Sequence, residues 1–145
     1  MPASSEDERI SRLSKLSDSL LERTSKVPGP PALLVLEDGA AFEGRGCAAR
    51  GEVFGEVCFN TSMVGYLEVV TDQSYAGQIV ALTYPQVGNY GVHPDDCQAA
   101  VPALRGLVVR DLCAVPSSWR AAKGLPGYLR EHGVVAIEGV DTRAL

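Results

Sequence analysis

Short apolar runs, each closed by turn residues, follow one another from residue 32 to the end of the chain. Runs of β-branched and aromatic residues bounded by Gly, Pro, Asn and Asp are typical of strands, and the clusters between them are typical of loops. The first two runs are separated by Asp38-Gly39, a dipeptide that strongly favours a tight hairpin turn. The pattern therefore predicts strands at residues 33–36, 41–44, 57–59, 79–83, 107–109 and 134–137.

One helix is predicted between the last two of these strands. Ser117 or Ser118 is a suitable N-cap for it, and Gly133 is a suitable stop. Gly124 and Pro126 lie inside the segment, so two short helices with a break between them are an alternative. Its apolar positions are Leu125, Tyr128 and Leu129. Strand, helix and strand would form one late β-α-β unit in a chain otherwise dominated by strands, which predicts an α/β fold.

Two further stretches carry predictions about local structure. Asp141 is a suitable cap for a helix that would open at residues 141–145. In residues 55–91 a turn at Gly65 is followed by a short apolar stretch and a polar quartet, and no helix is predicted there. Many small polar side chains stand at the strand ends of this region. They indicate a surface built for contact.

The first 31 residues differ from the rest. Residues 5–25 predict a helix capped by Ser5, with an apolar stripe made of Ile10, Leu13, Leu16 and Leu20. Two interpretations are open: a frayed extension, or a helix that packs on a partner. Residues 27–31, Val-Pro-Gly-Pro-Pro, predict a stiff linker. The chain therefore divides into a helical extension and linker at residues 1–31 and a globular part at residues 32–145.

The composition excludes several classes of protein. A chain of 145 residues with 46% hydrophobic composition can build one domain with a core. Its net charge of −5 provides no basic field for nucleic acid, and its apolar runs are far too short to span a membrane. The N-terminus lacks the apolar segment of a signal peptide and carries too many acids for a mitochondrial transit peptide. A cytoplasmic protein without nucleic-acid or membrane partners is predicted.

The cysteines and histidines supply few parts for chemistry. The four cysteines are Cys47, Cys58, Cys97 and Cys113, and they form no C-x-x-C pair. Cys58 and Cys113 stand within or beside apolar runs, which predicts buried, reduced thiols and neither a disulfide nor a zinc site. The motifs G-x-S-x-G, G-x-C-x-G and the phosphate-binding P-loop are absent. A cysteine enzyme using Cys47 or Cys58 ranks last, because His93 follows turn residues and His132 fits a helix C-terminus.

Several motifs in one order carry a resemblance to a known family. They are LLVLEDG at 33–39, GEVCFNTSMVGYLEVVTDQSYAGQIVALTYPQVGNYGV at 55–92, GLVVRDL at 106–112, PSSWR at 116–120 and LPGYLREHGVVAIEGVDTRAL at 125–145. From residue 32 to residue 145 the chain resembles the N-terminal domain of the small, glutamine-hydrolysing subunit of carbamoyl-phosphate synthase. The resemblance implies a swivelling β/β/α fold that docks on the large subunit.

The resemblance also implies a reaction shared between domains. In the family, a C-terminal class I amidotransferase domain hydrolyses glutamine with a Cys and a His, and the ammonia passes through a tunnel to the large subunit. That subunit uses ATP and Mg to combine ammonia with bicarbonate into carbamoyl phosphate for arginine and pyrimidine synthesis. The chain has no counterpart of the amidotransferase domain, so alone it is expected to be inactive and to hold no cofactor. A non-catalytic, stand-alone interaction module that reuses the domain is the alternative.

One site residue follows from the resemblance. Ser74 corresponds to the serine of a T-D-P-S-Y segment that helps bind glutamine in the family, and Asp72 and Tyr75 match its neighbours. Gln73 replaces the proline, which we expect to loosen the loop because proline would fix φ. The alternative role of Ser74 is a turn hydroxyl bonded to nearby backbone.

Interface residues are predicted from the polar loops. Such loops on a rigid sheet commonly carry contacts, and two of them are therefore candidates for docking on the large subunit. Their residues are Asn60, Thr61, Ser62, Asn89 and Tyr90.

Overall fold

The computed structural model describes residues 29–145, so the helix predicted at residues 5–25 lies outside the described residues. The first strand begins at Pro31, inside the predicted linker. The elements are β1 (Pro31–Val35), β2 (Ala41–Gly46), β3 (Val57–Asn60), α2 (Tyr66–Thr71), η1 (Gln73–Tyr75), β4 (Ile79–Leu82), β5 (Gln86–Val87), η2 (Pro94–Asp96), β6 (Gly106–Val108), β7 (Asp111–Leu112), α3 (Leu125–Glu131) and β8 (Val135–Glu138). All six predicted strands are confirmed, with ends that shift by one or two residues.

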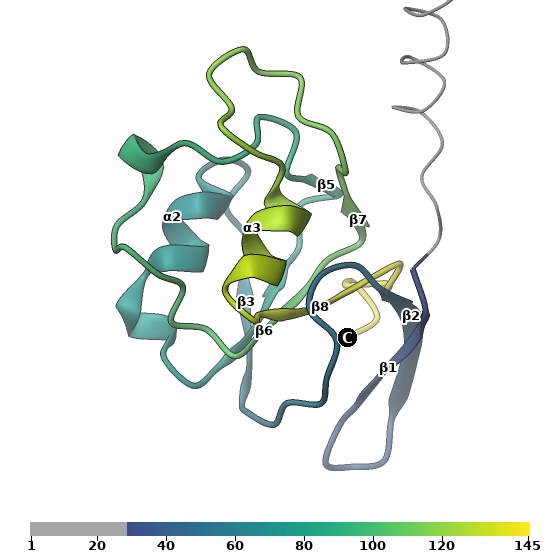
Figure 1. The fold of residues 1–145 in the computed structure, drawn as a ribbon. Helices are drawn as coiled ribbons and strands as arrows, with labels where there is room; N and C mark the ends of the chain where they lie inside the picture. The colour runs from purple at the N-terminus through teal and green to yellow at the C-terminus, as the bar shows by residue number, and fades with distance from the viewer. Residues whose placement is uncertain (1–28) are drawn as a thin grey trace, which may run out of the picture.

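A six-stranded mixed sheet organises the chain, in the order β1-β2-β8-β6-β4-β3 (Figure 1). Strands β3, β4, β6 and β8 pair in parallel, whereas the antiparallel hairpin β1–β2 joins β8 through the pairs Arg45↔Glu138 and Gly46↔Ile137. The late β-α-β unit is β6-α3-β8, as predicted. A short second sheet pairs β5 with β7 in parallel. The α/β class is therefore confirmed.

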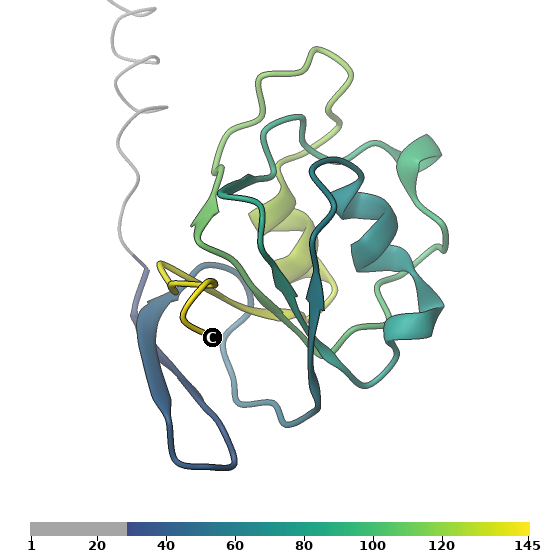
Figure 2. The same ribbon diagram turned by 180° about the vertical axis from the view of Figure 1, so that it is seen from behind.

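Two cores lie on opposite faces of the parallel strands. Helices α2 and α3 cover one face, while the hairpin and the C-terminal residues lie beyond the other (Figures 1 and 2). Because side chains alternate along a strand, Val80 of β4 packs in the helix-side core and Ala81 packs in the hairpin-side core, and both are fully buried. The helix-side core is the larger and holds Leu67 and Leu129.

The helices depart from the prediction in two places. Residues 66–71 form α2, where no helix was predicted. Helix α3 begins at Leu125 after the N-cap Gly124, so the predicted caps are wrong. Ser117 instead donates its N–H and hydroxyl to Asn89 O, at 2.9 and 3.0 Å, which ties residues 116–124 into a loop. The helix ends at the C-cap His132, before Gly133, as predicted.

The last residues form a turn rather than a helix. The carboxylate of Asp141 accepts a hydrogen bond from the backbone N–H of Arg143 at 3.1 Å, so its predicted capping role is retained. The N–H of Leu145 donates to Asp141 O, which closes a single turn. Within residues 29–145, none of the helices combines the length and apolar character needed to cross a membrane.

Candidate functional site

Ser74 lies in the single-turn helix η1, between α2 and β4. The carboxylate of Asp72, which caps this turn, accepts a hydrogen bond from the backbone N–H of Ser74 at 2.9 Å. That N–H, and after it the Ser74 hydroxyl, stabilises the ionised carboxylate and lowers the pKa of Asp72. Ser74 itself is exposed. The turn therefore presents an accessible hydroxyl on a backbone that Asp72 holds in place.

Gln73, at the position where the resemblance leads us to expect proline, attaches the same turn to another segment. Its Nε2 donates to Val101 O at 3.4 Å, a long hydrogen bond to the segment between η2 and β6. A proline would restrain φ but could make no such contact. The side chain of Gln73 thus connects the Ser74 turn to a segment 28 residues further along the chain.

The turn that holds Ser74 is linked to the first of the two predicted interface loops. Asn60, the last residue of β3, donates from Nδ2 to the hydroxyl of Tyr75 at 3.1 Å. The Asn60 Oδ1 accepts the N–H of Ser62 at 2.9 Å, which shapes the loop after β3. Thr61 and Ser62 are exposed beside it. The structure therefore brings the Asn60 loop and the Ser74 turn into one connected region.

The second predicted loop adjoins the first. The hydroxyl of Tyr90 accepts the backbone N–H groups of Gly65 and Tyr66 at 2.9 and 3.2 Å. Asn89 is exposed, and its carbonyl accepts the hydrogen bonds from Ser117. Tyr90 is half-buried, and the hydrogen bonds that its hydroxyl accepts give it a structural role. Its role in an interface stays a prediction.

Exposed apolar side chains surround these polar loops, and sequence reasoning missed them. Phe59 is 49% exposed on β3, and Met63 and Val64 are 71% and 75% exposed in the loop that follows. Tyr84 lies two residues beyond the end of β4. Thr83, between them, donates its N–H to Asn60 O and so connects this segment to the end of β3. The available signal was the pair Met63-Val64 between polar Ser62 and flexible Gly65. Met63 and Val64 lie in the loop between β3 and α2, outside any strand or helix that would bury them against the core.

Both histidines, and the thiols of Cys97 and Cys113, contact residues that are at most four positions away in the chain. The predicted burial of Cys58 and Cys113 is wrong, since both are half-buried. His93 Nδ1 accepts the N–H of Asp95 at 3.3 Å, and His132 packs edge-on against Tyr128. Within residues 29–145, no three metal-ligating side chains gather in one place.

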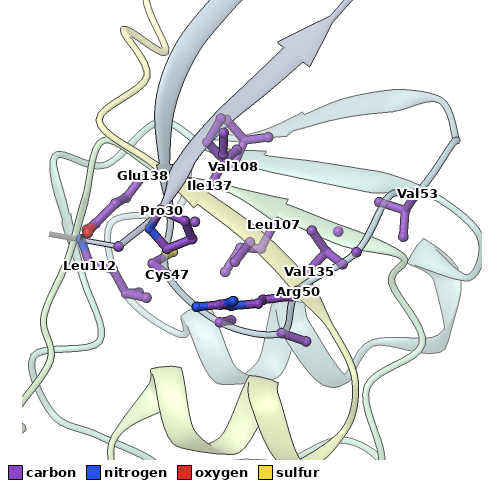
Figure 3. Close-up of a pocket in the computed structure, with 18 of the residues that line it drawn as sticks. Pro30, Cys47, Arg50, Val53, Leu107, Val108, Leu112, Val135, Ile137 and Glu138 are labelled. Atoms are coloured by element: carbon purple, nitrogen blue, oxygen red, sulfur yellow. Dashed lines mark hydrogen bonds between the residues drawn. The ribbon is translucent and has the colours of Figure 1, made fainter.

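A cavity of about 780 Å³ opens between the hairpin, the 47–53 segment and the strands β6 and β8 (Figure 3). Its walls are mainly apolar, with Leu107 and Ile137 among them. Glu138 lines it and is 7% exposed, and its carboxylate accepts the backbone N–H of Leu112 at 3.1 Å. Arg50 lines the same cavity (Figure 3). The cavity is separate from the Ser74 turn, since the two share no residue.

Known proteins resemble the part of the chain that forms this structure. Residues 34–145 match the family model for the carbamoyl-phosphate synthase small chain, CPSase domain. Proteins named carbamoyl phosphate synthase small chain from Syntrophotalea carbinolica, Synechococcus sp. and Thioalkalivibrio sulfidiphilus are 52%, 55% and 56% identical to it. Each alignment covers 79% of this chain and 29–30% of the relative, so the chain spans less than a third of the curated relatives' length. With most of its folded residues matched in this way, the chain belongs to the carbamoyl-phosphate synthase small chain family.

Proposed function

We propose that this chain is the N-terminal part of the small subunit of a glutamine-hydrolysing carbamoyl-phosphate synthase, and that Ser74 contributes to its glutamine site. The observation that carries the proposal is the exposed Ser74 hydroxyl on a turn held by Asp72, within the residues that match the family. A hydroxyl both donates and accepts hydrogen bonds, as the amide and α-carboxylate of glutamine require. Ser74 would bind glutamine, and a Cys/His amidotransferase domain outside this chain would hydrolyse it.

The second part of the proposal is docking on the large subunit. The carboxyl ends of β3 and β4 combine the polar Asn60–Ser62 loop with the exposed Phe59, Met63 and Tyr84. Protein interfaces commonly have an apolar centre, enriched in aromatic residues and Met, within a polar rim. This surface has both components, and Asn60 connects its loop to Tyr75 by a hydrogen bond.

The proposal extends to the reaction of the complete assembly. Ammonia released from glutamine would pass to the large subunit, which would use ATP, Mg and bicarbonate to form carbamoyl phosphate for arginine and pyrimidine synthesis in the cytoplasm. The residues described here would supply a scaffold of the swivelling β/β/α type. Family membership supports this assignment, and the mixed sheet with helices on one face is compatible with it.

The test of the glutamine site compares two nitrogen sources. A complete small chain carrying this domain is assembled with the large subunit, and carbamoyl phosphate synthesis is measured with glutamine and with ammonia. For Ser74→Ala we expect the KM for glutamine to rise about five- to thirtyfold, because a hydrogen bond to a polar substrate is worth roughly 1–2 kcal/mol. Ammonia-dependent synthesis should be unchanged, and Ser74→Thr, which keeps the hydroxyl, should recover part of the loss. Unaltered glutamine kinetics would remove Ser74 from the site.

The test of docking uses the exposed apolar residues. Met63→Asp with Val64→Asp should weaken binding to the large subunit at least about tenfold in calorimetry, because charge would enter an apolar interface centre. The matched control is Leu33→Asp with Val35→Asp, since these side chains are also exposed, at 58% each, but lie on β1 at the opposite edge of the sheet. Equal effects of both pairs would place the interface elsewhere. A wild-type chain that forms no complex would favour the stand-alone module.

A further inference from the structure

A second pocket, with a volume of about 440 Å³, lies between residues 92–100, the loop before α3 and α3 itself. Val92, Pro94, Ala99 and Ala122 give it a mainly apolar lining. Val92 connects two of its walls, because its carbonyl accepts the N–H of Ala122 and its own N–H donates to Lys123 O, both at 2.9 Å. The pocket is therefore preformed, and its volume is within the range of small-molecule sites.

One buried polar group of this pocket lacks a partner. Tyr128 lines the pocket and is 6% exposed, and its hydroxyl makes no hydrogen bond to the described residues. The neighbouring thiol of Cys97 is a weak acceptor, and it donates to His93 O at 3.7 Å. The Tyr128 hydroxyl thus bears the cost of its desolvation without a compensating hydrogen bond. An oxygen atom brought by a ligand would supply the missing acceptor.

The charges around the pocket favour an uncharged ligand. Lys123 is the one charged residue among the described residues that line the pocket, and its Nζ is already paired with the carboxylate of Glu131. Asp95 and Asp96 directly follow Pro94 in the chain, so an anion would approach two acids without an unpaired cation in the lining. A cation would find no carboxylate in that lining.

We propose that this pocket binds a small, uncharged carbonyl compound whose oxygen accepts a hydrogen bond from the hydroxyl of Tyr128. The apolar part of such a ketone, ester or amide would pack against Val92 and Ala122. The hydroxyl is itself shielded from solvent, so a side chain must turn aside when the ligand binds. Cys97 lines the pocket and is half-buried, and its hydrogen bond to His93 is long, so its side chain can make this movement.

A wall of this pocket is also attached to the turn that carries Ser74. The backbone N–H of Gln98 donates at 2.9 Å to the hydroxyl of Thr71, the last residue of α2. Three residues after Gln98, the carbonyl of Val101 accepts the hydrogen bond from Gln73. A ligand that moves this wall would therefore act on the Ser74 turn through two hydrogen bonds. This coupling concerns the conformation of the turn and does not rest on its proposed role in binding glutamine.

The test titrates the isotope-labelled full chain with N-methylpyrrolidone, an uncharged amide whose carbonyl oxygen can accept a hydrogen bond. Binding is followed through the backbone amide signals in NMR spectra at neutral pH. The test variant is Tyr128→Phe, which removes the proposed donor and keeps the ring. The matched control is Tyr84→Phe, which removes a hydroxyl outside the pocket.

We expect saturable binding to the unmodified chain and to the control, with the largest shifts at Ala99, Ala122 and Lys123 and smaller ones at Gln73 and Ser74. For Tyr128→Phe the dissociation constant should rise about three- to tenfold, because one hydrogen bond is lost. Ala122→Leu, which places a larger side chain at an exposed position of the lining, should abolish saturable binding.

Three results would overturn the proposal. Shifts that grow without saturation, or that lie away from the pocket, would show that the amide does not bind there. Equal dissociation constants for the unmodified chain and Tyr128→Phe would remove the hydroxyl from the site, and unchanged binding to Ala122→Leu would remove the pocket. Shifts in the pocket without any at Gln73 and Ser74 would refute the coupling to the turn. Glutamine kinetics enter none of these results, so the proposed glutamine site stands or fails separately.

Discussion

The rings of Tyr66 and Tyr90 stack with their centroids 4.1 Å apart, and each hydroxyl binds the backbone next to the other ring. The Tyr66 hydroxyl donates to Gly91 O at 2.7 Å. The Tyr90 hydroxyl accepts the N–H groups of Gly65 and Tyr66, at the start of α2. Gly65 offers no capping side chain, so Tyr90 supplies from a distant loop the acceptor that an N-cap residue normally provides. This pair joins the Asn89–Tyr90 loop to the start of α2.

Tyr90→Phe should destabilise the fold by about 1–2 kcal/mol, because it leaves the first N–H groups of α2 without their acceptor while keeping the stacked ring. Urea denaturation measures the loss. Hydrogen exchange should locate it in α2, where Leu67 and Val69 would lose protection. Tyr84→Phe is the control, since Tyr84 is 37% exposed and removal of its hydroxyl should cost nothing measurable. If both variants are equally stable, the Tyr90 hydroxyl is not a cap.

The same contact explains why α2 could not be predicted from the sequence. Its apolar residues include Val69 and Val70, which are β-branched and typical of strands, and Gly65 gives no capping signal. The helix forms because Leu67 and Val70 are buried in the larger core and Tyr90 satisfies its first N–H groups. Both causes are tertiary, and neither is visible in a local window.

For the hairpin and the buried strands, the local sequence signals were sufficient to predict the structure. The hairpin follows from Asp38-Gly39, with Gly39 at φ 89°, and the buried strands follow from continuous apolar runs such as that of β4.

The start of α3 was misplaced because Ser117, judged from the sequence alone, is as suitable an N-cap as any other residue. Only the structure shows that Ser117 is engaged with Asn89.

In the candidate site, Ser74 was predicted from the resemblance to a known family and not from its residue type or its local sequence pattern. A serine between polar neighbours is an ordinary turn residue, and nothing in the local pattern distinguishes Ser74 from one. Residue types did predict the polar loops. The exposure of Met63 and Val64 beside them depends on how the chain leaves β3, which no periodicity reports.

Asp72 should matter for glutamine use, if the proposed function holds, because it positions Ser74. In the complete assembly we expect Asp72→Ala to raise the KM for glutamine several-fold, and Asp72→Asn, which keeps an acceptor for the Ser74 N–H, to raise it less. Ammonia-dependent synthesis and the kcat with ammonia should not change in either variant. The lowered pKa of Asp72 keeps it ionised at any pH above its usual value, so these effects should not vary between pH 6 and pH 8 within roughly a factor of two. An Asn variant worse than the Ala variant would contradict this positioning role.

Tyr128 should make the fold sensitive to alkali. Its hydroxyl is buried and has no hydrogen-bond partner among the described residues. Burial, followed by the neighbouring Cys97 thiol, raises the pKa of Tyr128 to about 12 from 10.0. Below pH 10 the phenol is protonated in both the folded and the unfolded chain. Above it the unfolded chain ionises first, so the free energy of unfolding falls between about pH 10 and pH 12.

Tyr128→Phe tests both statements. At pH 8 the variant should be as stable as the parent or more stable by about 1 kcal/mol, because it removes a buried donor without a partner. Between pH 8 and pH 11 it should lose about 1 kcal/mol less than the parent in urea denaturation. Burial also raises the pKa of Tyr90, so part of the alkaline loss should remain. A variant much less stable at pH 8 would show that the hydroxyl has a partner.

Gly91 should tolerate no side chain, because two separate costs meet there. Its φ of 72° is left-handed, which costs any other residue about 1–2 kcal/mol. A Cβ at this position would also lie 2.6 Å from Ala121 Cβ, 2.8 Å from Pro116 Cβ and 2.9 Å from Lys123 O. These atoms belong to the loop before α3 and cannot all withdraw, since Val92 exchanges backbone hydrogen bonds with that loop. We expect Gly91→Ala to destabilise by about 3 kcal/mol or more in urea denaturation.

Gly39→Ala separates the two costs. Gly39 has a similar left-handed φ of 89°, but a Cβ there would meet no atom within 4 Å. Its replacement should therefore cost only the backbone strain, about 1 kcal/mol. If Gly91→Ala costs no more than Gly39→Ala, the loop before α3 gives way to the added methyl group, and the Asn89–Gly91 segment is held less tightly than its contacts with Ser117 and Tyr66 imply. A difference of about 2 kcal/mol would instead show that the loop before α3 cannot withdraw from an added methyl group, and that its contacts hold Gly91 in place.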